Sequence, residues 1–408
     1  MPPELDAALE ELDARLARYP ASRYPVQHAT AQFHRGRVLI EAGCPGDAEQ
    51  ALRRAVQLFA GLPLEQAKAC NLLGVALRLR ARLDEAQNAF ARAEAAFAAE
   101  EKPLEQGAAT FNLGLVQAEA GATIAARRSF ERARQLFGEY GAPGRAAAAG
   151  RELGSVLLAA GDADAAARAL EEALDASERA GDRVGQGLVA NALGLAHLAA
   201  GHVDAAVDAL QTAVGAHPRS VRPEAYAMAK ANLAMAYEQA GDGPRARLAA
   251  RQALGTPGSD RAVAAQAAAV LERSGAADDD LVVVLDQEPR DRWLPVIREE
   301  VTRWADADPA ERRRGASRWI EGQLARPDRA SDLAEAWLGV LLELPPETME
   351  ELVRATIAAL AAHDEDARSR FRRSTARAMA RFNVPQLLRV QQVFSATAQE
   401  LGEDGSWR

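Results

Sequence analysis

The sequence predicts an all-α protein in which stacked helix pairs are followed by a smaller helical domain, and three observations support this. Alanine, the residue with the highest helix propensity, makes up 95 of the 408 residues. Leucine–glycine pairs recur every 40 residues through the first part of the chain. All five Trp residues lie beyond residue 276. We therefore expect a repeat array over 1–255, a capping helix and linker over 256–290, and a helical C-terminal domain over 291–408.

Small residues at fixed positions define the repeat. A Leu-Gly pair recurs at a 40-residue spacing, continued by Leu233-Ala234 and preceded by Arg35-Gly36: Leu73-Gly74, Leu113-Gly114, Leu153-Gly154 and Leu193-Gly194. A glycine stands seven residues after each small residue, except at Ala81. A second set recurs in step: Ala48/Leu52/Ala55, Ala86/Phe90/Ala93, Ala126/Phe130/Ala133, Ala166/Leu170/Ala173, Ala206/Leu210/Ala213 and Ala246/Ala250/Ala253. Six aligned copies indicate a structural repeat.

The pattern of each unit predicts two helices joined by a tight turn. Cys70, Leu73 and Gly74 lie on one stripe of a helix, and the small Gly74 allows a second helix to approach closely. The turn glycine fits a left-handed position that ends the first helix. The second helix places Ala86, Phe90 and following residues on its own apolar stripe. Neither stripe can be buried by one unit alone, so the copies are expected to stack.

This pattern resembles the tetratricopeptide repeat, which has a small residue at its eighth position, Ala at its twentieth, an aromatic residue or Leu at its twenty-fourth and Ala at its twenty-seventh. The resemblance covers roughly residues 24–256 and implies a right-handed superhelix of about six repeats after an N-terminal helix. The usual unit has 34 residues, so a 40-residue period implies longer helices. The longer repeats resemble proteins of this family that bind extended peptides or act as regulatory scaffolds. The proline that usually closes a unit is irregular, with Pro143 and Pro218 near junctions.

The remainder of the chain has a different composition. A capping helix is expected over about 260–273, and Asp278-Asp279-Asp280 precedes an apolar run, Leu281–Leu285, that suits either a strand or a docking segment. Helix start signals then recur at Asp308-Pro309, Ser331, Pro346-Glu347, Asp364 and Pro385. We expect about six helices in 291–402, without a repeat that can be aligned. The Trp residues suit a core, but an exposed pair would indicate a docking surface.

Sequence motifs for catalysis or cofactor binding are weak. No Lys follows a phosphate-binding glycine loop, and the six His residues include no metal-binding i, i+4 pair. Gly185–Ala190 matches a dinucleotide fingerprint only as a string, since it begins a repeat helix instead of following a strand. We therefore predict a protein that is not an enzyme and has no cofactor or metal, although the C-terminal part leaves room for a hidden site.

Charge and cysteine content bear on partners and location. A net charge of −9 disfavours general nucleic-acid binding. The two Cys residues and the absence of a signal-peptide core favour a cytoplasmic protein. Val184–Val203 carries no charged residue and is long enough to span a bilayer, but it falls in register with the repeat, so no membrane association is expected. The oligomeric state stays open.

Asparagines on the first helices are candidate partner-binding residues. Asn71 and Asn191 lie three residues before the small residue, and Asn112 and Asn232 lie two before it. In the resembled family both positions face the concave groove. A side-chain amide can both donate to and accept from a peptide backbone, which suits an extended segment. The alternative is that these side chains bond a neighbouring repeat or water. Four charged residues are expected on the same surface: Arg37, Arg78, Arg151 and Glu238.

A second candidate surface is an arginine stripe on a helix expected over 364–383. Arg370, Arg373, Arg377 and Arg381 recur at i, i+3, i+7 and i+11, apart from an apolar stripe of Phe371, Ala378 and Phe382. The stripe suits an acidic partner or a phosphate group. The alternative is a solvated face, partly neutralised by acids at the N-terminus of the helix.

The sequence thus predicts a binding module whose concave groove holds a peptide or helix of a partner protein. The alternative is an assembly factor, scaffold or regulator of a larger enzyme complex that acts through the Trp-containing C-terminal domain.

Overall fold

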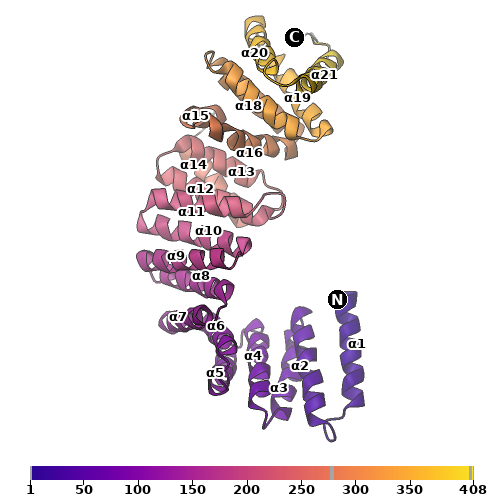
Figure 1. Cartoon of the computed structure of the whole chain (residues 1–408), viewed down its shortest axis with the longest axis vertical. Coiled ribbons are helices and arrows are strands. Elements are labelled where there is room, and N and C mark those ends of the chain that lie inside the picture. The colour runs from indigo at the N-terminus through magenta and orange to yellow at the C-terminus, as the bar shows by residue number, and fades with distance from the viewer. Residues whose placement is uncertain (1, 276–279, 404–406, 408) are drawn as a thin grey trace. The chain divides into compact units, whose positions relative to one another are not determined.

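The computed structural model describes residues 2–275, 280–403 and 407, and within these ranges the chain is helical with no strand (Figure 1). The chain divides into two compact units, residues 1–216 and 217–408. The predicted boundary at residue 255 therefore falls inside the second unit. Residues 276–279, part of the predicted linker, lie outside the described residues. Among the helices described, none has the length and apolarity needed to cross a bilayer.

The first unit consists of an N-terminal helix and five helix pairs. Its helices are α1 (Pro3–Arg18), α2 (Pro25–Glu41), α3 (Pro45–Leu58), α4 (Pro63–Leu79), α5 (Leu83–Ala99), α6 (Pro103–Glu119), α7 (Thr123–Glu139), α8 (Pro143–Ala159), α9 (Ala163–Arg179), α10 (Arg183–Ala200) and α11 (Val203–Ala216). Pro25, Pro63, Pro103 and Pro143 each begin the first helix of a pair. Proline suits this position because the first helical N–H needs no partner, so these prolines are regular after all.

The predicted close contact between paired helices is confirmed in every pair of the first unit. A Cβ placed on the small residue would stand only 2.4–2.8 Å from the large side chain of the second helix. The pairs are Gly36 with Leu52, Gly74 with Phe90, Gly114 with Phe130, Gly154 with Leu170, and Gly194 with Leu210. Glycine is required here because the partner side chain occupies the space that any Cβ would fill.

The turn inside each pair needs a left-handed residue. Gly121, Gly161 and Gly201 have φ between 74° and 81°. Ala81 holds the equivalent place with φ of 56°, so the sequence exception keeps the same backbone conformation. The turn geometry of the repeat is thus independent of which residue fills it, although an L-residue adopts it at a cost.

The second unit begins with a sixth pair and continues into the C-terminal helices. Its elements are α12 (Pro223–Gln239), α13 (Gly243–Leu254), α14 (Arg261–Ser274), α15 (Asp280–Gln287), a 3₁₀ turn (Arg290–Arg292), α16 (Trp293–Asp306), α17 (Pro309–Leu324), α18 (Ala330–Glu343), α19 (Pro346–Leu360), α20 (Glu365–Met379) and α21 (Val384–Glu400). The capping helix is α14, and the six helices expected in 291–402 are α16–α21. Leu281–Leu285 is neither a strand nor an exposed docking segment, because these residues form α15 and are largely buried.

The C-terminal helices contain a second repeat that was not predicted from the sequence. Helices α17, α19 and α21 begin 37 and 38 residues apart, and α16, α18 and α20 begin 37 and 35 apart. Contacts run mainly from each helix to the helix two places further along, as in α16 with α18 and α17 with α19. The sequence feature that marks this repeat is a proline in the first turn of α17, α19 and α21, at Pro309, Pro346 and Pro385.

The five Trp side chains are all buried, which confirms their interpretation as core residues. Trp319 and Trp337 lie with ring centroids 6.0 Å apart, and Phe394 meets Trp337 edge-on at 6.2 Å. Aromatic rings of this size supply much of the apolar area that a small helical domain can bury. The alternative of an exposed Trp docking surface is therefore wrong.

Candidate partner-binding surface

The candidate surface lies on the first helices of successive pairs in the first unit, on the stripe next to the one buried against the second helix. We call it the first-helix face and define it by residues of α4, α6, α8 and α10: Asn71, Val75, Arg78, Leu79, Phe111, Asn112, Leu115, Glu119, Arg151, Ser155, Leu188, Asn191 and Leu195. Asn71, Val75 and Arg78 are spaced i, i+4 and i+7, so they share one side of α4. All members are half-buried or exposed.

Two of the predicted asparagines meet across adjacent repeats. Asn112 Nδ2 donates to Asn71 Oδ1 at 3.1 Å, and both side chains are half-buried. An amide can donate two hydrogen bonds and accept two. The bonded pair therefore keeps the Nδ2 donor of Asn71 and the Oδ1 acceptor of Asn112 for another group.

Charged residues of the first-helix face are joined in pairs. Arg78 of α4 donates to Glu119 of α6 at 2.6 Å, which links the same two helices as the asparagine pair. Arg151 lies 2.7 Å from Glu152 on α8. Arg37, on α2, is exposed. Pairing leaves the centre of this surface close to neutral.

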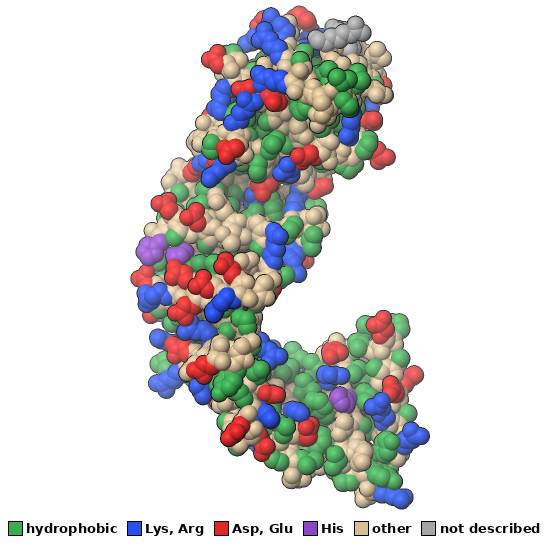
Figure 2. Space-filling view, viewed as in Figure 1, with side chains coloured by type: hydrophobic (Ala, Val, Ile, Leu, Met, Phe, Trp, Pro, Cys, Tyr) green, Lys and Arg blue, Asp and Glu red, His purple; other side chains and the backbone are tan. Residues whose placement is uncertain are grey.

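Apolar side chains separate these polar groups. Leu79 is 51% exposed and Leu188 is 39% exposed, while Val75 and Leu115 are half-buried. The Phe111 ring is half-buried and packs edge-on against Phe130, 5.6 Å between centroids. Figure 2 shows hydrophobic side chains interspersed with charged ones on the side of the molecule in view. The surface can therefore bury apolar area and satisfy peptide groups together.

Asn232 and Glu238 belong to the second unit and have partners there. Asn232 is only 4% exposed and accepts a hydrogen bond from Gln266 of α14 at 2.8 Å. Glu238 binds Arg273 of α14 through both oxygens, at 2.8 and 2.7 Å. The capping helix thus covers this end of the predicted set, and a row of four exposed asparagines does not form. Asn191 is half-buried and engaged in a contact of its own.

The arginine stripe is shorter than predicted. Helix α20 ends at Met379, and Arg381, beyond it, binds Asp332 and Glu335 of α18 at 2.6 Å each. Arg370 pairs with Asp366 one turn earlier. Arg373 and Arg377 remain exposed and form no ion pair with any residue that the structure describes.

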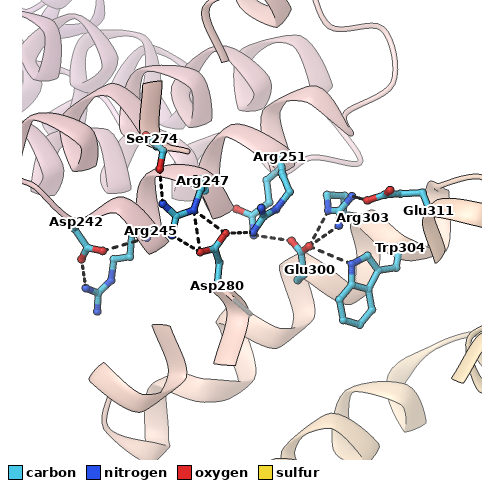
Figure 3. Close-up of polar contacts among 11 residues, drawn as sticks. Asp242, Arg245, Arg247, Arg251, Ser274, Asp280, Glu300, Arg303, Trp304 and Glu311 are labelled. Atoms are coloured by element: carbon cyan, nitrogen blue, oxygen red, sulfur yellow. Dashed lines mark hydrogen bonds and ion pairs between the residues drawn. The ribbon is translucent and has the colours of Figure 1, made fainter. Parts of the chain in front are cut away.

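Buried charge in the second unit was not anticipated from the sequence. Asp280, 1% exposed, is bound by Arg247 through both oxygens at 2.7–3.1 Å and by Arg251 (Figure 3). Glu300, 3% exposed, accepts from Arg303 at 2.6 Å and from the Trp304 indole at 3.1 Å. From the sequence, Asp280 and Glu300 cannot be distinguished from ordinary surface charges, because the helices that bury them lie elsewhere in the chain.

A second unforeseen cluster surrounds Glu49 in the first unit. Its buried carboxylate accepts from Arg53 and Arg82 at 2.7 Å, and from Arg80. Burial acts to raise the pKa of Glu49, but the hydrogen bonds from Arg53, Arg82 and Arg80 outweigh it and hold the pKa below its ordinary value. This cluster joins α3 to the turn between α4 and α5.

Other kinds of site are less developed. Among the described residues, no three His, Cys, Asp or Glu side chains gather as metal ligands would. Shallow pockets lie between neighbouring repeats, one lined by Arg134, Glu172 and Arg179 and another by Glu178, Arg183 and Thr212.

The stacked helix pairs, with glycine under a large side chain in each, define a helical-repeat scaffold. The family model described as tetratricopeptide repeat matches residues 144–218, the segment of α8 to α11, so these two helix pairs match tetratricopeptide repeats. Repeats of this family are modules for protein–protein interaction, and the match supports an interaction scaffold in this segment. No curated protein sequence matches the chain.

Solved structures with similar folds come from several sources. BtubC (BKLC) from P. vanneervenii is 18% identical, with 52% of this chain and 88% of that chain covered and a TM-score of 0.45. Aspartyl phosphate phosphatase F from Bacillus subtilis is 16% identical, with coverages of 67% and 69% and a TM-score of 0.45. The apo form of RapI is 11% identical, with coverages of 81% and 97% and a TM-score of 0.44. At these identities the likeness concerns the fold alone.

Proposed function

We propose that the protein binds an extended segment of a partner protein along the first-helix face. The observation that carries this is the Asn71–Asn112 pair, which lies among half-exposed apolar side chains. Asparagine lowers helix stability by about 0.6 kcal/mol relative to alanine. Alanine is common throughout the chain, at 95 of 408 positions, so amides kept at these helix positions favour a role beyond helix formation.

The amide pair suits one peptide group of a bound segment. A backbone N–H can donate to Asn112 Oδ1 while the neighbouring C=O accepts from Asn71 Nδ2. Such contacts fix the direction of the segment without selecting its side chains. Specificity would then come from the apolar neighbours, Leu79, Val75 and Leu115.

The charges of the first-helix face indicate which kind of partner segment it suits. Arg78 and Glu119 neutralise each other, so a strongly charged segment would gain little there. We propose a segment with spaced apolar side chains and little net charge. Arg373 and Arg377 on α20 are a separate proposed surface, one that suits an acidic partner. Free Cys44 and Cys70 fit a reducing compartment, and we propose the cytoplasm.

The experiment is selection from a random peptide display library on the full chain, followed by calorimetry of the selected peptides. Replacing Asn71→Ala and Asn112→Ala together should weaken binding by about 1–3 kcal/mol, since each lost hydrogen bond contributes about 0.5–1.5 kcal/mol. The melting temperature should stay equal or rise because alanine favours helix.

Asn88→Ala is the matched control, because Asn88 is an exposed asparagine on the second helix α5. It should leave peptide affinity unchanged. Equal affinity in the double variant and the wild type would overturn the proposal. A double variant that melts earlier and still binds would assign the pair a structural role.

A further inference from the structure

The second unit contains two separate apolar cores. Helices α12–α14 share one built mainly from alanine, including Ala231, Ala250 and Val270. Helices α15–α21 share the other, which contains all five Trp residues. Among the buried residues described, Leu248 of α13 is the one side chain from before α15 that joins this second core. The joint between the two cores therefore has little apolar contact.

Ion pairs hold this joint together instead. Arg247 and Arg251 of α13 bind Asp280 of α15, as Figure 3 shows. Further pairs join Arg245 to Glu288 at 2.6 Å, Lys230 to Glu299 at 2.6 Å and Arg219 to Asp306 at 3.0 Å. Each pair has one member from residues 219–251 and one from residues 280–306. We call this charged joint the seam, and pairs of opposite charge bridge it along its length.

Ionic and apolar seams respond differently to their surroundings. Apolar contact persists across salt concentrations, whereas ion pairs weaken as salt screens them, the exposed ones most. A buried pair also fails abruptly when one partner is removed, because the other charge is left uncompensated. Alanine contacts join α12 to α13, so the charged seam is the weak plane of this unit.

We propose that the seam is a hinge, at which α15–α21 moves as one body relative to α12–α14 when the Asp280 network opens. The backbone offers a pivot, because α14 ends at Gly275 with φ of +73°, a conformation in which glycine is unstrained. Both cores stay intact in the open state, since neither contributes much to the seam. The hinge gives the scaffold two arrangements of its C-terminal helices.

The test is hydrogen–deuterium exchange of the full chain, with Asp280→Asn as the variant and Asp286→Asn as the matched control. Asp286 lies on the same short helix, but it binds Arg326 and Arg329 within the C-terminal part. Asp280→Asn should raise exchange in α13 and α15 at least about tenfold. Exchange in α17, α19 and α8 should not change. Asp286→Asn should leave α13 as in the wild type.

A salt series on the wild type provides a second measurement that needs no variant. Raising sodium chloride from 0.05 to 1 M should increase exchange in α13 and α15 less than Asp280→Asn does, because salt screens the half-exposed pairs of the seam more than the buried Asp280, and before any change in α19. Scattering should report a larger radius of gyration for Asp280→Asn. Uniform acceleration throughout residues 217–408 in either experiment would show one cooperative block and overturn the hinge. Unchanged exchange at α13 in both experiments would overturn it equally.

Discussion

Gly154 of α8 lies directly against Leu170 of α9: a Cβ on residue 154 would stand 2.5 Å from Leu170 Cγ. Gly154→Ala should therefore force the two helices apart or push Leu170 from its rotamer. We expect a loss of about 1–3 kcal/mol in the free energy of unfolding, the usual cost of overpacking. Gly154→Leu should cost at least as much. Urea unfolding followed by circular dichroism measures both.

Gly138→Ala on α7 provides the control, because nothing lies within 4 Å of the place its Cβ would take. Alanine is favoured over glycine in a helix by about 1 kcal/mol, so this variant should be neutral or more stable. Equal stability of Gly154→Ala and Gly138→Ala would contradict the assigned contact.

The repeat could be predicted from sequence because it rests on local spacing. Gly154 and Leu170 are 16 residues apart and recur with the same separation in each pair, so a periodic pattern reveals their contact. The left-handed turn glycines, such as Gly161, followed in the same way. These features depend on one helix pair and its nearest neighbour only.

The features that could not be predicted from the sequence depend on contacts between distant segments of the chain. Asn232 has the same spacing to its small residue as Asn112, yet Gln266 of the capping helix buries one and leaves the other half-exposed. Helices α16–α21 have no small residue at a constant position, so their repeat is visible only in the helix packing and in the first-turn prolines of α17, α19 and α21. Buried Asp280 likewise depends on Arg247, 33 positions away in the chain.

Ala81→Gly should stabilise the first unit. Ala81 has φ of 56°, a left-handed conformation that costs an L-residue about 1–2 kcal/mol. Glycine adopts it freely but loses more entropy on folding, so a net gain of about 0.5–1 kcal/mol is expected. Thermal melting compares the variant with the wild type. Ala120→Gly is the control, because Ala120 has φ of −80° and should gain nothing. A lower melting temperature for Ala81→Gly would refute the strain.

Glu49→Gln should destabilise the first unit by about 1–3 kcal/mol at pH 7, because hydrogen bonds to charged groups contribute about this much. The pKa of Glu49 is held below its ordinary value of 4.5 by hydrogen bonds from arginines, against the effect of burial. Its contribution is therefore present above pH 4.5 and lost as pH falls through the lower folded pKa. The stability difference between variant and wild type should shrink towards pH 3. Exposed Glu10→Gln should show no difference at either pH.

His197 should make the stability of the first unit depend on pH at higher pH than Glu49 does, again with stability lost as the pH falls. Burial lowers the pKa of His197 from its ordinary 6.5, and the nearby His202 lowers it further. Glu171, which lies 3.9 Å from Nε2, acts to raise the pKa but does not outweigh burial. Below pH 6.5 the unfolded chain binds a proton that the folded chain does not, so stability falls as pH drops from 7.5 towards 5. One proton contributes at most about 1.4 kcal/mol per pH unit. His197→Gln should flatten this decline in a pH series of urea unfolding, while His202→Gln, at an exposed position, should leave most of it. Parallel pH curves for His197→Gln and the wild type would show that His197 takes up its proton equally in both states.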